Sequence, residues 1–294
     1  MTDPKVSTIH RGGSRFYIDP ETGRKNPGVT SILNMLPKPF LKAWAAKLVA
    51  ETAVENITEV IGLAFRDPQG AIDYLKRAPD RFTRSAADNG TEVHDVFEEI
   101  AKGNKPKRYH PDIEPYVEHF EEFIELCDPE FILLEETVWS DTTGYAGSFD
   151  ALATLHGEGA GELQGKTLFM DWKTTRSGVH PEVALQLAGY RFADAIVRPD
   201  GERVPLPEAD GGAVLHVRPE GWQLVPVETE MVEIAEGIEV NVYDYLKALR
   251  EVFDWDFEVK KHVVKRAVAA GGEFSTTRKK QHIKPRAKMT RRAR

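Results

Sequence analysis

The sequence has 294 residues, of which 41% are hydrophobic and 29% are charged, and its net charge is −8. This composition is typical of a globular protein with one large or two small domains. No apolar run approaches the ~18 residues of a membrane span, and the N-terminus lacks the pattern of a signal peptide, so we expect a cytoplasmic protein without membrane partners. The single cysteine, Cys127, excludes disulfides within the chain, multi-thiolate zinc sites and cysteine-held iron–sulfur clusters, and we expect a buried thiol.

The charge is unevenly distributed along the chain. Residues 259–294 contain 13 Lys or Arg and one acid, a charge of +12, so residues 1–258 carry −20. The pattern predicts a flexible basic tail over 259–294. Such a tail either binds DNA phosphates or only adds solubility.

The N-terminal part, residues 1–128, is predicted to be mostly helical. A short strand and a turn are expected over 15–25, and Thr30 or Ser31 can cap a short first helix that Pro37 and Pro39 separate from a second. The second helix carries Leu41, Trp44, Ala45 and Leu48 on one stripe. Further helical patterns cover residues 69–77, 80–102 and 111–127.

The hydrophobic period changes near residue 130. Three consecutive strands are predicted over 130–140, 144–155 and 166–175, because these segments are short, rich in β-forming residues and separated by glycine-containing turns. A helix over 181–197, with Pro181 in its first turn, two strands within 212–228 and an amphipathic helix over 229–251 follow. This order predicts an α/β fold with a small mixed central β-sheet flanked by helices.

Asp171 and Lys173 lie in the apolar strand segment "LFMDWKTT". Residues i and i+2 of a strand point to the same face, so the two side chains are expected to lie side by side. Burying them is costly unless they pair with each other or hold a charged group. The spacing alone is not specific, because Asp3 with Lys5 and Glu258 with Lys260 have it too.

Asp150 ends the segment "YAGSFD" on the strand that precedes Asp171. As the two strands are expected to form a hairpin, the two carboxylates can converge at one end of the sheet. A divalent cation would relieve their repulsion, and Lys173 could stabilise charge on a phosphate. The alternative is a hairpin with two acids near turns and a surface ion pair.

His94 lies at the edge of a helical stripe formed by Val93, Phe97 and Ile100. It is either a boundary residue of the core or a metal ligand, and Glu98 shares its face four residues later. Imidazole suits zinc better than Mg²⁺ or Mn²⁺, so ligand type does not decide the metal.

Gln186 and Tyr190 share a helix face with Val183 and Leu187, the side that should meet the sheet. Two hydrogen-bonding groups on a buried stripe need partners. They either tie the helix to the ends of the strands or position a lysine, a metal-bound water or a phosphate.

In this order, Gly90 with His94, "GSFD", "DWK" and "QLAGY" resemble the motifs of the PD-(D/E)XK nuclease superfamily, in its RecB-like exonuclease branch. Similar members include phage-encoded, CRISPR-associated and mitochondrial exonucleases. The resemblance covers residues 90–192, and "GVTSIL…PKPFLKAWA" is similar to the N-terminal helices of phage members. Each motif is weak alone, but four in order are specific. The chain departs from the pattern in lacking the four-cysteine iron–sulfur cluster of many relatives and in the long separation of Asp150 from Asp171.

The resemblance implies a restriction-endonuclease-like core over 129–258 and a metal-dependent DNA exonuclease that uses Mg²⁺ or Mn²⁺. The implied metal ligands are His94, Asp150, Asp171 and the carbonyl of Trp172, and Lys173 is the implied catalytic lysine. Gln186 and Tyr190 would support the site and the DNA, and Glu98 could reach the metal through water. In the tail, the candidate DNA contacts are Arg278, Lys279, Lys280, Lys284 and Arg286.

The resemblance further suggests a phage origin, a role in DNA recombination, repair or replication in the host cytoplasm, and a single-strand annealing protein as partner. The N-terminal helices would wall a channel for a DNA end or single strand. Trp44 or Trp172 could stack bases there, and core packing is the alternative for Trp44. Two other functions fit the sequence: an endonuclease of DNA or RNA from the same superfamily, and a DNA-binding module without catalysis.

Overall fold

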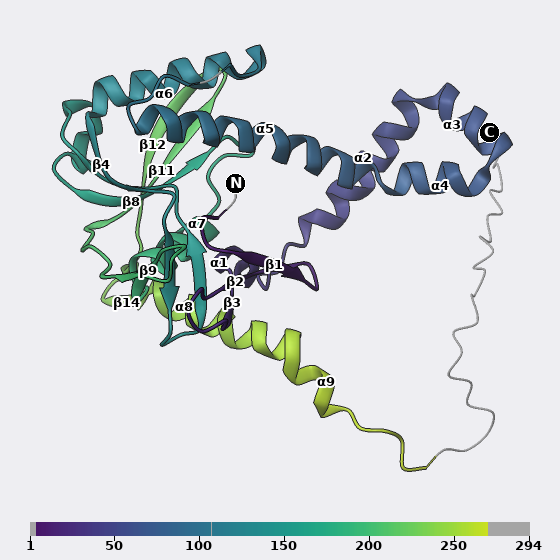
Figure 1. Ribbon diagram of the computed structural model, residues 1–294. Coiled ribbons are helices and arrows are strands. Elements are labelled where there is room, and N and C mark those ends of the chain that lie inside the picture. Colours follow the sequence, from purple (N-terminus) through teal and green to yellow (C-terminus); the bar gives the residue numbers. More distant parts are fainter. Residues whose placement is uncertain (1–3, 107, 270–294) are drawn as a thin grey trace.

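The protein is built around a five-stranded mixed sheet (Figure 1). The computed structural model describes residues 4–106 and 108–269. The strand order is β12-β11-β8-β7-β4, and β8 and β11 are parallel while the other neighbours are antiparallel. The strands are β4 (Pro129–Leu134), β7 (Ala151–Leu155), β8 (Thr167–Lys173), β11 (Gly211–Arg218) and β12 (Gly221–Val227). The expected α/β fold with a mixed sheet flanked by helices is therefore confirmed. Its assignment as a restriction-endonuclease-like core stays a prediction.

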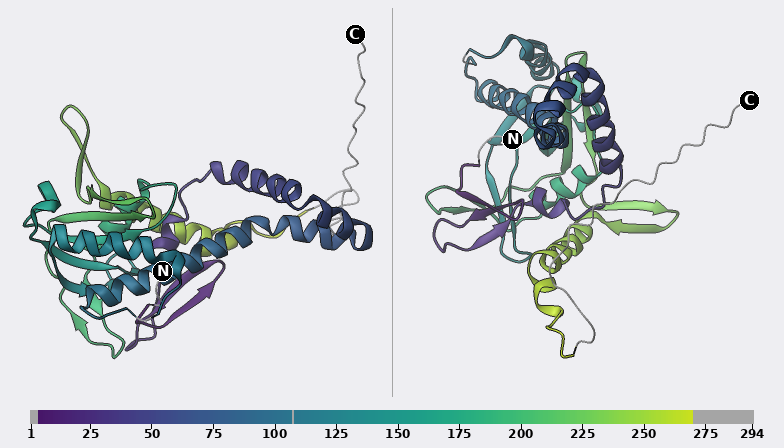
Figure 2. Two further views of the ribbon diagram at one scale, coloured as in Figure 1. Left: turned by 90° about the horizontal axis from the view of Figure 1, so that it is seen from above. Right: turned by 90° about the vertical axis from the view of Figure 1, so that its right-hand side faces the viewer.

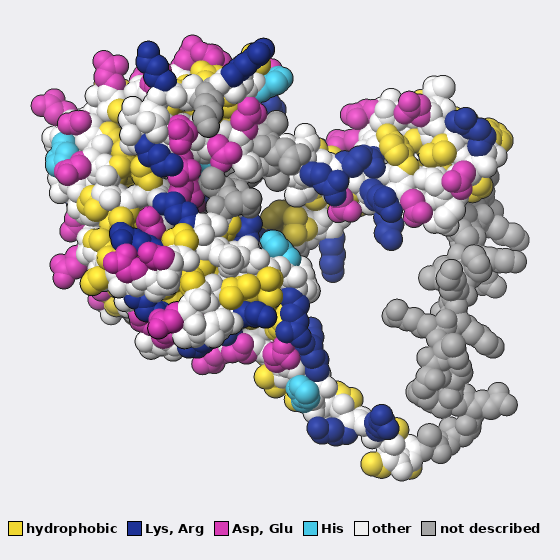
Figure 3. All heavy atoms as spheres, in the orientation of Figure 1, with side chains coloured by type: hydrophobic (Ala, Val, Ile, Leu, Met, Phe, Trp, Pro, Cys, Tyr) yellow, Lys and Arg dark blue, Asp and Glu magenta, His cyan; other side chains and the backbone are white. Residues whose placement is uncertain are grey.

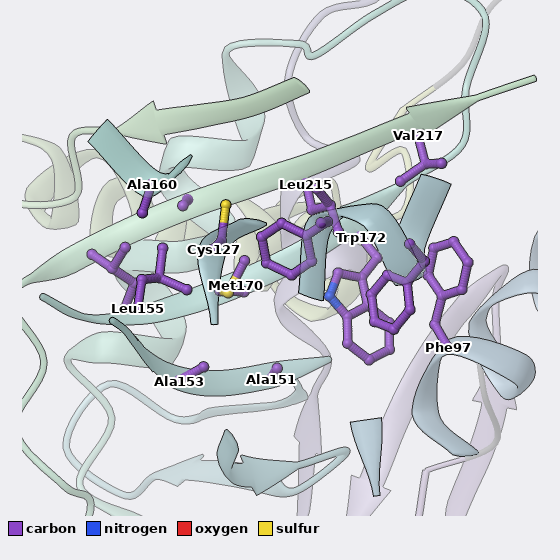
Figure 4. Packing of buried hydrophobic residues seen from close by; sticks show 14 of the residues in the cluster. Phe97, Cys127, Ala151, Ala153, Leu155, Ala160, Met170, Trp172, Leu215 and Val217 are labelled. Atoms are coloured by element: carbon purple, nitrogen blue, oxygen red, sulfur yellow. The ribbon is translucent and has the colours of Figure 1, made fainter. Parts of the chain in front are cut away.

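Side chains of β8 alternate between two hydrophobic clusters, as the period of a strand requires. Leu168, Met170 and Trp172 belong to the cluster under α5 (Ala78–Ala101) and α6 (Glu114–Cys127). Figure 4 shows Phe97 of α5 and Cys127 of α6 in this cluster, with Met170 and Trp172. Cys127 is fully buried, as expected.

The second face of the sheet carries the other cluster, which includes Phe169, Leu187 and Leu246. Three helices cover it: α1 (Val29–Leu33), α7 (Glu182–Arg191) and α8 (Val242–Asp254). A four-stranded sheet, of order β10-β9-β5-β6, lies beside them. Its strands are β5 (Thr137–Ser140), β6 (Tyr145–Ser148), β9 (Ala195–Val197) and β10 (Arg203–Val204).

The structure also contains a small N-terminal sheet and four short helical segments. The sheet contains β1 (Thr8–Arg11), β2 (Ser14–Ile18) and β3 (Lys25–Pro27), where the sequence predicted a single strand. A parallel bridge between Gly28 and Ala146 joins it to β6. The helical segments are η1 (Pro111–Ile113), η2 (Glu158–Leu163), the π-helical η3 (Trp255–Val259) and α9 (Lys260–Val263).

A helical arm extends from the core, as Figures 1 and 2 show. It consists of α2 (Phe40–Glu55), α3 (Ile57–Arg66), α4 (Pro68–Lys76) and the first turns of α5, which then continues into the core. The Asp67 side chain accepts a hydrogen bond from the Gly70 N–H at 2.9 Å and caps α4. No residue of α2 is buried, so the predicted apolar stripe of this helix does not pack into the core.

Two predicted strands and one predicted helix are wrong in part. The strands predicted over 130–140 and 144–155 are each divided in two, into β4 with β5 and β6 with β7. The helix predicted over 181–197 ends at Arg191, and Pro181 precedes its first residue as the N-cap.

The helix predicted over 229–251 begins only at Val242. Its first half is a hairpin of β13 (Met231–Ala235) and β14 (Ile238–Asn241). The turn places Gly237 at φ 71°, and the Asn241 side chain caps α8 by accepting from the Tyr243 N–H. No helix in the described ranges is long and apolar enough to span a bilayer.

Candidate active site

Asp171 and Lys173 form an ion pair at the end of β8. Their Oδ2 and Nζ atoms are 2.6 Å apart, and the exposed fraction of the side chain is 5% for Asp171 and 31% for Lys173. The same-face geometry predicted from the i, i+2 spacing is confirmed. The pair is thus anchored on a buried strand, while the ammonium group remains partly accessible.

Asp150 lies between β6 and β7, immediately before the hairpin partner of β8. Ala151 pairs with Met170, which brings Asp150 next to the last residues of β8. The Trp172 backbone N–H donates a hydrogen bond of 2.6 Å to Asp150 Oδ2. The predicted convergence of the Asp150 and Asp171 strands is therefore confirmed, although the segment holding Asp150 is a break between two strands.

His94 reaches the site from α5. Its Nδ1 atom lies 3.6 Å from Asp150 Oδ1, and its ring centroid lies 6.0 Å from that of Trp172. His94 is buried, with 8% of its surface exposed, and among the described residues Nδ1 has no hydrogen-bond partner. A buried ring nitrogen without a partner is costly, so His94 is poised to bind a further group.

Glu135 also belongs to this site, and the sequence analysis did not identify it. Its φ of 51° is left-handed, which breaks the chain between β4 and β5. Its backbone N–H donates to the Asp150 carbonyl at 3.0 Å, and the residue is buried. Glu135 could have been found from the sequence as an acidic residue inside the apolar strand segment "FILLEETVW", since buried carboxylates are rare unless they are paired.

Three of these residues place possible ligand atoms close together. One ligand atom each of His94, Glu135 and Asp150 lies within 4.8 Å of the others. Asp171 is next to these three residues, because the charges of both Asp150 and His94 act on its carboxyl group. We name His94, Glu135, Asp150 and Asp171 the acidic cluster.

Gln186 and Tyr190 of α7 hold Asp171 from the other side. The Gln186 amide donates to Asp171 Oδ1 at 2.7 Å and to the Tyr190 hydroxyl at 3.0 Å. Tyr190 is buried, and burial raises its pKa well above the ordinary value, so the phenol stays protonated. Of the two roles left open by the sequence, the structure shows the tie between α7 and the strand end.

The charges of the site are strongly coupled. Burial opposes ionisation of Asp150, but the His94 charge, Lys173 and the Trp172 N–H outweigh it and lower its pKa. Burial raises the pKa of Asp171, and Asp150 adds to the rise although Lys173 opposes it. Burial disfavours the ammonium form of Lys173, but Asp171 and Asp150 outweigh it and raise the pKa of Lys173. Lys173 is therefore charged at neutral pH.

The acidic cluster fits a divalent cation. Carboxylates crowded in a buried region repel each other, and at Asp171 the charge of Asp150 adds to the rise in pKa that burial causes. His94 Nδ1 adds a nitrogen ligand atom that has no hydrogen-bond partner among the described residues. A set dominated by carboxylates with one imidazole suits Mn²⁺ or Mg²⁺.

Other predicted site residues are placed differently. The Trp172 side chain is fully buried, and its ring packs edge-on against Phe97 and Phe120, so it cannot stack a base. A metal contact by the Trp172 carbonyl stays a prediction. Glu98 pairs with Lys102 at 2.7 Å and is not among the three residues with mutually close ligand atoms. The candidate tail contacts Arg278, Lys279, Lys280, Lys284 and Arg286 lie outside the described residues.

The family-model and curated-protein comparisons give no relative with which to interpret this site. No protein-family model matches the sequence, and no curated protein matches it at a significant level. The interpretation therefore depends on the geometry of the acidic cluster.

Proposed function

We propose that the protein is a metal-dependent nuclease that hydrolyses phosphodiester bonds of DNA from an end, on a core of the restriction-endonuclease type. One observation supports this above the others: the ion pair of Asp171 and Lys173 lies beside the mutually close ligand atoms of His94, Glu135 and Asp150. A structural ion pair would not need three further ligand groups next to it.

The chain's own groups would hold Mg²⁺ or Mn²⁺ through the acidic cluster. When bound, the ion would supply a Lewis acid and an activated water. The Trp172 N–H fixes one carboxylate through Asp150 Oδ2, and the Gln186 amide fixes the other through Asp171 Oδ1. Because both carboxylates are oriented by hydrogen bonds before any ligand binds, little reorganisation would be needed on binding.

Lys173 would stabilise the charge that develops on the phosphoryl oxygens. Its ammonium group is held by Asp171 and is partly exposed, so a phosphate can approach it. Water would add to phosphorus while the bond from phosphorus to the bridging oxygen breaks. One proton of the water ends on the departing oxygen and the other is released from the new phosphomonoester.

Surface charge favours an approach of DNA from the side of the arm. Helix α6, which packs on the core cluster that contains Trp172, carries five Glu and no Lys or Arg. Residues 38–84 of the arm carry eight Lys or Arg against six Asp or Glu. Figure 3 shows Lys and Arg side chains gathered on the part of the arm that lies next to the core.

The test is digestion of linear DNA labelled at either end, with Mg²⁺, with Mn²⁺ and with a chelator, beside closed circular DNA. Lys173→Ala is the active-site variant, and Lys166→Ala is the matched control because Lys166 is exposed just before the same strand. We expect metal-dependent loss of linear DNA that Lys173→Ala abolishes and Lys166→Ala retains. Circular dichroism of both variants verifies their fold.

Two outcomes would change the proposal. Cleavage of the closed circle would make the protein an endonuclease. Intact substrates under every condition, with a shift of DNA in a gel, would overturn catalysis and leave a DNA-binding module.

A further inference from the structure

A cavity of about 680 Å³ lies between the arm and the core. Its aromatic lining comes from three helices: Trp44 of α2, Phe82 of α5 and Tyr116 of α6. Its polar lining includes residues 174–177, "TTRS", which directly follow Lys173, and Asp112. The volume is within the ~300–1,000 Å³ of ligand pockets in general, and the mixture of aromatic walls with a few polar groups is typical of them.

The Trp44 and Phe82 side chains form an aromatic pair that serves no core. Their ring centroids are 6.0 Å apart at an interplanar angle of 70°. Phe82 is 56% exposed, and Trp44 is only partly buried on a helix that buries no residue. Large aromatic side chains left in solvent beside a cavity indicate a binding surface. The core-packing alternative for Trp44 is therefore wrong.

The cavity adjoins the acidic cluster. Gly90 lines it and precedes His94 by one helical turn, about 6 Å along the axis of α5. A Cβ atom at Gly90 would lie 3.7 Å from Thr174 Oγ1, the hydroxyl next to Lys173. A strand whose phosphate lies at Lys173 can thus place a neighbouring base in the cavity.

The polar wall is held in place from within the core. His216 of β11 is buried, and its Nε2 lies 2.7 Å from the Thr175 carbonyl while its Nδ1 lies 3.0 Å from Gln223 Nε2. Because a carbonyl only accepts, His216 Nε2 donates the hydrogen bond to Thr175. This chain of hydrogen bonds fixes the segment that carries Arg176 at the rim of the cavity.

From these contacts we propose that the cavity binds one unpaired nucleobase of a DNA strand whose backbone lies at Lys173, with Trp44 and Phe82 as the stacking surface. Arg176 and the adjacent hydroxyls provide donors for the base edge or for the next phosphate, and the carboxylate of Asp112 can accept from an exocyclic amine. A paired base inside a duplex has no free face to stack, so the substrate class is single-stranded DNA or a frayed end. This inference depends on the proposed function and narrows its substrate.

The test combines changes in the protein with changes in the DNA. All protein variants also carry Lys173→Ala, so that no DNA is digested. Fluorescence anisotropy measures binding of an oligothymidylate, of the same strand with a single abasic position moved along it, and of a blunt duplex. The variants are Trp44→Ala and the conservative Trp44→Phe, with Trp255→Ala as control because Trp255 is 51% exposed on η3, away from the cavity.

We expect Trp44→Ala to weaken binding of the single strand by about 5- to 150-fold, the effect of losing one stacked base, while Trp44→Phe retains most of the affinity. At one abasic position, the protein with Trp44 and the Trp44→Ala variant should bind the strand with equal affinity. Trp255→Ala should bind as tightly as its parent. Equal binding by Trp44→Ala, or an equal loss with every abasic strand and with the duplex, would overturn the proposal.

Digestion by the protein with an intact Lys173, in the same buffer with Mn²⁺, separates this inference from the nuclease proposal. Digestion combined with binding that does not depend on Trp44 overturns the base pocket and leaves the nuclease. Binding that depends on Trp44 without digestion supports the pocket and overturns the nuclease.

Discussion

Gly147, in the segment "GSFD", is required for space at the candidate active site. It lies on β6, and its φ is not in the left-handed region, so backbone conformation does not demand glycine there. A Cβ atom at this position would lie 2.7 Å from Tyr190 Cε1, whereas an ordinary contact is at least 3.4 Å. Gly147→Ala therefore forces the ring or the strand to move by about 0.7 Å.

Tyr190 has little freedom to accommodate that movement. It is 2% exposed, its ring lies 6.2 Å from that of Phe149, and its hydroxyl is bonded to the Gln186 amide that also holds Asp171. Overpacking of this kind costs about 1–3 kcal/mol. At about 2–4 °C per kcal/mol for a chain of 150–250 residues, the midpoint of thermal unfolding should fall by about 2–12 °C. The proposed nuclease activity should fall as well, since the tie to Asp171 is displaced.

Thermal unfolding followed by circular dichroism checks this value. Gly62→Ala on the exposed arm is the control, because its Cβ meets nothing closer than 4.0 Å, and we expect it to be neutral or stabilising by about 0.5–1 kcal/mol. In a double-mutant cycle, Gly147→Ala should be much less harmful in a Tyr190→Leu background, where the ring is absent. An unchanged midpoint, or an equal penalty in both backgrounds, would refute the steric argument.

Three further predictions concern other parts of the molecule. His216→Ala should lower the turnover of the proposed nuclease by about 2- to 10-fold and increase hydrogen exchange over residues 174–178, because one hydrogen bond to Thr175 is lost. His216→Gln should restore part of both effects, and unchanged exchange would show that the segment needs no anchor. Burial opposes ionisation of Asp19, but the N–H groups of Thr22 and Glu21 and the charge of Arg203 outweigh it and lower its pKa. The carboxylate therefore stabilises the fold at pH values above its ordinary pKa of 3.8, and this stabilisation is lost as the pH falls through the lower pKa of the folded state. The difference in unfolding midpoint between the unmodified protein and Asp19→Asn should therefore be largest near neutral pH and shrink as the pH falls below 3.8. A difference independent of pH would contradict the assignment. Burial raises the pKa of the Cys127 thiol, so a thiol reagent should label it only after unfolding, and rapid labelling of the folded protein would show that the core around it opens.

The sequence by itself determined the features that depend on local period. The i, i+2 rule placed Asp171 beside Lys173, and the i, i+4 rule placed Gln186 beside Tyr190, because strands and helices have fixed repeats whatever packs against them. It also predicted α5, α6 and the mixed sheet, since long apolar stripes with clear ends are strong signals.

Breaks in the strands were decided by tertiary structure. The segment 130–140 has the composition of one strand, yet it passes from one sheet to another at Glu135, whose left-handed conformation is supported by its hydrogen bond to the Asp150 carbonyl. No local pattern reports that bond, because its partner lies 15 residues away. For the same reason the sequence did not reveal Glu135 as a member of the acidic cluster.

The spacing of apolar residues can fit both a helix and a β-hairpin when the partner of the apolar face is unknown. Met231, Ile234 and Ile238 have helical spacing, but they are 45%, 62% and 54% exposed on the hairpin of β13 and β14. Trp44 has helical spacing too, and its side chain lines a cavity. Period tells which residues of an element share a face, but only the assembled chain decides whether that face meets a core, a ligand or water, because burial depends on residues distant in the sequence.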